Sequence, residues 1–95
     1  MALSTDGERS AFLAEHPDWA ISGETLHKTF TFTDFVAAMG FVTRVAIIAE
    51  KANHHPDIDI RWNRVSIALS THDEGGLTEK DAALALRIEK LQPIS

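Results

Sequence analysis

The stretch IDIRWNRVSIALS, residues 58–70, has the most regular pattern in the sequence. Apolar and polar residues alternate on both sides of the segment 62–64, and a period of two is typical of strands that bury one face. Asparagine, present at position 63, is common in tight turns. The stretch therefore predicts an antiparallel hairpin with strands over 58–62 and 64–70. Its inward faces consist of Ile58, Ile60 and Trp62 in the first strand and Val65, Ile67 and Leu69 in the second.

A second hairpin is predicted upstream. Residues 19–22 are a short strand candidate, residues 26–32 alternate strictly, and Gly23-Glu24 between them is a turn signal. One face of the longer strand consists of Leu26, Lys28, Phe30 and Phe32.

Helices are predicted on either side of these hairpins. The first covers residues 6–15, with Thr5 or Asp6 as its N-cap. It ends at His16-Pro17, because the residue before a proline avoids the α region. The second covers about residues 34–51, and Thr33 is expected to cap its first turn.

The last helix begins after Thr78, with Asp81 three residues on as a capping-box partner, and it ends before Pro93. The resulting order is α-β-β-α-β-β-α. This order predicts an α+β fold of two layers, in which three helices cover one face of a four-stranded antiparallel sheet.

The helix predicted over residues 34–51 is apolar nearly all round, far beyond the single stripe that packs on one sheet. In a chain of 95 residues, one side of this helix can face the sheet and the other is expected to face another protein surface. We therefore expect a homo-oligomer, a dimer or tetramer, with this helix near its interface. The alternative is that the two flanking helices cover it.

Composition narrows the function classes. The length predicts a single domain over residues 1–95, and the net charge is 9 − 14 = −5. This acidic balance argues against a nucleic-acid partner, since such binders neutralise phosphates. Without cysteine, disulfides, thiolate nucleophiles and Cys-ligated metal or iron–sulfur sites are impossible. The five histidines remain the best source of acid–base chemistry near neutral pH.

Targeting signals are not evident in the sequence. Residues 1–8 lack the basic and apolar regions of a secretory signal, and the apolar-rich run 35–49 is shorter than the roughly 20 residues of a membrane span. We therefore expect a cytoplasmic protein without a membrane partner.

Three histidines and one glutamate form the candidate site. Glu50 and His54 are four residues apart and share one helical face if the helix persists that far. His54 and His55 stand before a proline, so both rings could line one cavity at an irregular helix exit. His72 follows the last strand, where site residues are common.

Other interpretations of these histidines are open on the residues alone. A His pair can simply favour the dipole at a helix C-terminus, and His and Glu are legitimate zinc or iron ligands. The sequence contains no HExxH motif, and adjacent histidines rarely converge on one ion. His16 and His27 are interpreted as incidental.

The string Glu50-x3-His54-His55-Pro56-x5-Trp62-x9-His72-x8-Asp81 resembles the signature of the pterin-4a-carbinolamine dehydratases, also called 4a-hydroxytetrahydrobiopterin dehydratases. The flanking segments 69–72 and 76–81 are similar to the same family, whose fold has the element order predicted above. Two positions depart from the usual pattern. Asn53 stands where Asp is frequent, and Lys80 stands where Arg is common.

The resemblance implies a hydro-lyase that dehydrates a 4a-hydroxytetrahydropterin to a quinonoid dihydropterin, within tetrahydrobiopterin recycling. It implies histidine acid–base catalysis with no metal and no cofactor. Trp62 is interpreted as a core aromatic. The implied catalytic residues are His54, His55 and His72, with proton transfer assigned to His54 and His72 and pterin binding to His55. The implied substrate-binding or orienting residues are Glu50, Asn53, Ser70, Thr71, Lys80 and Asp81.

Two other function classes are weighed against this one. Relatives of the family include non-catalytic modules that assist dimerisation of a homeodomain transcription factor or assembly of a carbon-fixing enzyme, and such relatives can lack the full histidine set. A small histidine-ligated metalloprotein is the other alternative. The retained histidines favour the enzyme.

Overall fold

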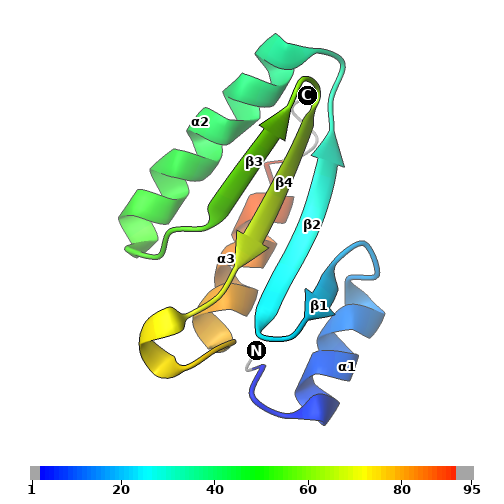
Figure 1. Cartoon of the computed structure of the whole chain (residues 1–95), viewed down its shortest axis with the longest axis vertical. Helices are drawn as coiled ribbons and strands as arrows, with labels where there is room; N and C mark the ends of the chain where they lie inside the picture. The colour runs from blue at the N-terminus through cyan, green and yellow to red at the C-terminus, as the bar shows by residue number, and fades with distance from the viewer. Residues whose placement is uncertain (1–2, 92–95) are drawn as a thin grey trace.

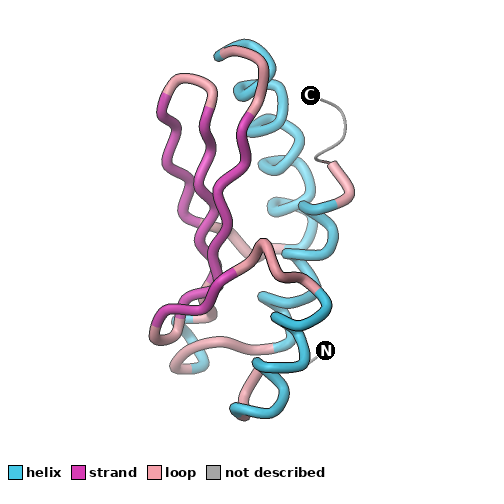
Figure 2. Tube along the Cα trace, turned by 90° about the vertical axis from the view of Figure 1, so that its right-hand side faces the viewer, coloured by secondary structure: helices cyan, strands magenta, loops and turns pink. Residues whose placement is uncertain are grey.

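The computed structural model describes residues 3–91. It consists of one sheet with all three α-helices on one of its faces (Figures 1 and 2), which confirms the predicted α+β class and element order. In chain order the elements are α1 (Asp6–Glu15), β1 (Ala20–Ser22), β2 (Thr25–Thr31), α2 (Phe35–Ala52), β3 (Asp57–Arg61), β4 (Arg64–Leu69), the 3₁₀ turn η1 (His72–Glu74) and α3 (Glu79–Glu89).

The sheet joins the two predicted hairpins through their second strands. Its order is β1-β2-β4-β3, and every neighbouring pair is antiparallel. Phe30 of β2 lies opposite Val65 of β4, and Ile60 of β3 lies on the other side of Val65. This register brings the inward faces of both hairpins together beneath the helices, where apolar burial is the main favourable term in folding.

The core confirms most of the predicted inward faces. Leu26, Lys28, Phe30 and Phe32 of the first hairpin are buried, as are Val65, Ile67 and Leu69 of the second. Lys28 is buried as an ion pair, since its Nζ lies 2.6 Å from Oε1 of Glu89 on α3. The same ammonium lies 4.6 Å from the centre of the Phe30 ring, a cation–π geometry.

Trp62 is not a core residue, and this prediction is wrong. Strand β3 ends at Arg61, and Trp62 adopts a left-handed backbone with φ 51° in the turn, which leaves its side chain 67% exposed. The alternation stops one residue earlier than the sequence pattern indicates. Asn63 fixes the turn by donating from Nδ2 to the carbonyl of Phe32 over 2.9 Å.

Two of the three α-helix N-caps match the sequence predictions. Thr5 forms a full capping box with Glu8 on α1, and Thr78 forms one with Asp81 on α3. For α2 the cap is Asp34 rather than Thr33, because the Asp34 carboxylate accepts from the backbone N–H of Ala37 at 2.8 Å. The predicted stop at Pro93 lies outside the described residues.

Helix α2 buries only one of its faces. Ala38, Phe41, Val45 and Ala49 recur at helical spacing and pack on the sheet. Other apolar residues of the same helix, Phe35, Val36, Met39 and Ile47, are exposed. Within residues 3–91 no helix is long and apolar enough to cross a membrane.

Acid should destabilise the fold partly through two surface carboxylates. Hydrogen bonds from the Ser4 and Thr5 hydroxyls lower the pKa of Glu8 below its ordinary value of 4.5. Hydrogen bonds from Arg9, and then from the backbone N–H of Leu77, lower the pKa of Glu24 in the same way.

A carboxyl whose folded-state pKa is depressed stabilises the fold above its unfolded value, and this contribution disappears as the pH falls through the folded-state pKa. We therefore expect the melting temperature to decrease as the pH is lowered below about 4.5. Glu8→Gln and Glu24→Gln should each make this decrease smaller. Calorimetry between about pH 3 and 6 measures this. Melting curves with the same pH slope in the wild type and both variants would contradict it.

Candidate active site

The end of α2 sets the direction of the histidine pair. Asn53 is the C-cap and adopts the left-handed conformation, φ 52° and ψ 43°, which asparagine tolerates better than most residues. Its backbone N–H and that of His54 bond back to carbonyls of the last helical turn. The helix therefore stops before the histidines, and the following chain is free to place both rings on the same side.

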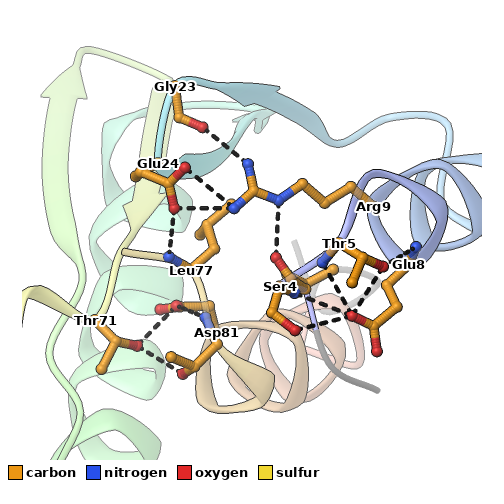
Figure 3. Close-up of polar contacts among 11 residues, drawn as sticks. Ser4, Thr5, Glu8, Arg9, Gly23, Glu24, Thr71, Leu77 and Asp81 are labelled. Atoms are coloured by element: carbon orange, nitrogen blue, oxygen red, sulfur yellow. Dashed lines mark hydrogen bonds and ion pairs between the residues drawn. The ribbon is translucent and has the colours of Figure 1, made fainter. Parts of the chain in front are cut away.

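His54 is held by a buried carboxylate. Its Nε2 lies 2.6 Å from Oδ1 of Asp81, whose side chain is fully buried at the start of α3. The other oxygen of Asp81 accepts from Thr71 Oγ1 at 2.8 Å and from the backbone N–H of Thr78 at 3.0 Å. Asp81 thus has two roles: it caps α3, and it fixes the His54 ring. Figure 3 shows its contact with Thr71.

His55 is held more loosely, at the surface. Its Nε2 lies 2.7 Å from Oε1 of Glu50, and both side chains are exposed. The sequence spacing pairs Glu50 with His54, but α2 ends at Ala52, so the turn of the chain brings His55 to this carboxylate instead. An exposed pair of this kind orients the ring without burying it.

His72 reaches the site from the connection between β4 and α3. It opens the turn η1, is exposed, and lies in a loop that Thr71 and Gly76 close with two backbone hydrogen bonds of 3.1 Å. The loop and the α2 exit face each other across a concave site of about 200 Å³. Its lining consists of Asn53, His54, His55, Ser70, Thr71, His72 and Asp73.

The predicted site residues thus divide by position. The three histidines, Asn53, Ser70 and Thr71 line the concave site, while Glu50 and Asp81 hold imidazole rings at its edge. Asp73 is a lining residue that the sequence reasoning missed, although its position next to His72 was a usable signal.

Lys80 does not line the histidine site. Its Nζ donates to Oε2 of Glu74 over 2.7 Å, and this hydrogen bond raises the pKa of Lys80. It therefore ties the first turn of α3 to the end of η1. An exposed pair of this kind contributes little to stability and is screened by salt.

The arrangement suits proton transfer to and from one small bound molecule. Imidazole has an ordinary pKa of about 6.5, which suits it to act as an acid and a base near neutral pH. A carboxylate bonded to one ring nitrogen fixes the tautomer and the ring plane, so that the other nitrogen faces a constant direction. Within residues 3–91, no group of three or more His, Asp or Glu side chains could hold a metal ion.

Comparisons with known proteins find relatives along nearly the whole chain. The family model described as "Pterin 4 alpha carbinolamine dehydratase" matches residues 2–91. A protein of Chloroflexus aurantiacus named "Putative pterin-4-alpha-carbinolamine dehydratase" is 53% identical over 96% of this chain and 98% of its own length. A protein of the same name from Thermomicrobium roseum is 48% identical over 96% of this chain and 98% of its own length.

Two solved structures share the fold. A transcriptional coactivator/pterin dehydratase from Brucella melitensis superposes with a TM-score of 0.86 at 36% identity, covering 93% of this chain and 96% of its own. A pterin dehydratase-like protein described as a RuBisCO assembly factor of the alpha-carboxysome superposes with a TM-score of 0.68 at 27% identity, covering 79% and 89%.

Proposed function

Because the chain belongs to the pterin-4a-carbinolamine dehydratase family, we propose that it dehydrates a 4a-hydroxytetrahydropterin to the quinonoid dihydropterin. In this step the bond between carbon 4a and its hydroxyl oxygen breaks, and the neighbouring ring nitrogen supplies the electron pair of the new C=N bond. The hydroxyl takes up one proton and leaves as water, and a ring N–H gives up another. The reaction needs an acid and a base but no oxidant or reductant.

The observation that supports this proposal most is the convergence of three imidazoles on one concave site, one of them bonded to a buried carboxylate. We assign proton transfer to His54 and His72 and pterin binding to His55. Each positioned acid or base typically contributes about 10²–10⁴-fold to the rate. Asp81 orients His54 and Glu50 holds His55, while Asn53, Ser70 and Thr71 offer polar contacts to the substrate.

Lys80 would act indirectly, without contacting the substrate. Its bond to Glu74 holds the end of the turn that carries His72, so we assign it an orienting role through that loop.

The direct test is dehydration of a 4a-hydroxytetrahydropterin generated in the cuvette and followed by ultraviolet absorbance. We expect the first-order rate to rise in proportion to the concentration of the chain, with EDTA present throughout. A rate equal to that of buffer alone, with folded protein, would refute the assignment.

We also propose that the chain is a homo-oligomer that buries the exposed face of α2. Val36, Met39, Thr43 and Ile47 follow one another at steps of three or four residues, so they form a single stripe opposite the stripe that packs on the sheet. Exposed apolar stripes of this kind commonly mark protein interfaces.

The oligomer is tested by light scattering after size exclusion. We expect the wild type to give a multiple of 10.5 kDa, and Val36→Asp or Ile47→Asp to shift it toward monomer, because a charge would be buried at the contact. Ala14→Asp, on the exposed side of α1, is the matched control and should leave the mass unchanged. A wild type of 10.5 kDa at micromolar concentration would exclude the oligomer.

A protein-assembly role is the second candidate function. It is favoured by the same exposed stripe. It is also favoured by the two solved relatives, one described as a transcriptional coactivator/pterin dehydratase and the other as a RuBisCO assembly factor. A stoichiometric partner recovered with a chain that lacks dehydratase activity would favour it over the enzyme.

A further inference from the structure

Glu24 connects the N-terminal part of the chain to the loop that carries His72. It lies in the turn between β1 and β2, and its carboxylate accepts from Arg9 Nη2 at 2.9 and 3.1 Å (Figure 3). The same carboxylate accepts from the backbone N–H of Leu77 at 3.1 Å. Arg9 is itself fixed, since it also donates to the carbonyls of Leu3 and Gly23.

The contact falls where the loop closes. Leu77 is buried, and Gly76, just before it, makes both backbone hydrogen bonds that close the loop onto Thr71. Gly76 has φ 149°, and a Cβ added to it would overlap the Glu24 carboxylate. The Glu24 side chain therefore lies directly against the backbone of this loop.

The loop in turn is joined to the candidate site by two routes. Thr71 precedes His72, and its hydroxyl donates to Asp81, the carboxylate that holds His54. Thr78 follows Leu77, and its hydroxyl forms a hydrogen bond of 2.9 Å with the Thr71 hydroxyl. The backbone N–H of Thr78 donates to Asp81. A shift of residues 76–77 would therefore displace both the His72 turn and the support of His54.

We propose that Glu24, held by Arg9, is a positioning residue that sets the relative placement of His54 and His72. This rests on the proposed function for its effect on rate. Glu24 does not line the concave site, so it acts only through the loop backbone. Misplacement of catalytic groups by about 1 Å can cost 10²-fold in rate, which makes a remote contact of this kind measurable.

The kinetic test compares Glu24→Ala with Glu8→Ala. Glu8 is a matched control, since it is also a hydrogen-bonded glutamate near Arg9, but its partners are Ser4 and Thr5 at the start of α1. We expect Glu24→Ala to lower kcat about 10-fold with KM little changed, and Glu8→Ala to leave kcat unchanged. Glu24→Gln should recover most of the loss, because its carbonyl oxygen can still accept from Leu77.

Equal kcat for Glu24→Ala and the wild type, or equal losses in both alanine variants, would overturn the proposal. Should Glu24→Ala fail to fold, Arg9→Ala makes the same comparison, because it releases the carboxylate and leaves the loop sequence intact.

An NMR measurement separates this inference from the proposed function. In Glu24→Ala the ring signals of both His54 and His72 should move, and the amide of Leu77 should exchange with solvent faster than in the wild type. In Glu8→Ala these signals should stay in place. Unmoved ring signals in Glu24→Ala overturn the inference whether or not the wild type is a dehydratase, whereas an inactive wild type with moved signals overturns only the function.

Discussion

His72→Ala is expected to lower kcat for the dehydration by about 10²–10⁴-fold without loss of stability. The imidazole is exposed on the turn η1, so its removal leaves no buried cavity and no orphaned buried partner. The loss should therefore be one of chemistry, visible in kcat by stopped-flow absorbance while the calorimetric melting temperature stays constant.

The matched control for this variant is His27→Ala. His27 lies in β2, which is outside the concave site, and it should keep the wild-type rate. A His72→Ala protein that dehydrates the substrate at the wild-type rate would show that His72 is not a catalytic residue.

Asp81→Ala should damage stability and activity together. The substitution leaves the Thr71 hydroxyl, the Thr78 N–H and the His54 ring without the acceptor that each now has. We expect the free energy of unfolding to fall by about 2–4 kcal/mol, from unsatisfied buried donors and the lost helix cap. For a domain of this size, that lowers the melting temperature by about 10–25 °C.

Asp81→Asn separates the two roles of this carboxylate. The amide keeps the shape and one acceptor oxygen, so it should retain more stability than alanine, but it cannot offer two acceptors and a charge to hold His54. We therefore expect kcat to fall in both variants and the melting temperature to fall mainly in Asp81→Ala. Glu79→Ala, an exposed acid in the same helical turn, is the control. An Asp81→Asn protein with full activity would show that His54 needs no carboxylate.

Local patterns were sufficient to predict most of the fold. Each hairpin and helix has its own periodicity and caps, and Thr5, Thr78 and Asp81 perform the predicted capping. The pairing of β2 with β4 could not be predicted in this way. It joins strands that are separated by the whole of α2, so no local sequence pattern indicates it. Trp62 was misplaced because alternation cannot tell the last residue of a strand from the first residue of a turn.

The candidate site could be predicted only in part: its residues were indicated, but most of their contacts were not. Spacing and the family resemblance indicated the histidines and Asp81, but the partner of each ring depends on where α2 stops. The αL conformation of Asn53 decides that Glu50 meets His55. The sequence did not indicate that Arg9 and Glu24 support the site, because both are far from the motif along the chain. Arg9 bonds to Glu24, and only Glu24 contacts the loop region, through the backbone N–H of Leu77.

Under the proposed function, the double use of Asp81 also makes the turnover rate sensitive to local order at the start of α3. Because one carboxylate both starts α3 and aligns His54, fraying of that first helical turn would release the imidazole before the rest of the protein unfolds. The rate should then decline at temperatures or denaturant concentrations where circular dichroism still reports a native protein. Under the proposed function, loss of catalysis would thus report the opening of the first turn of α3 rather than of the core.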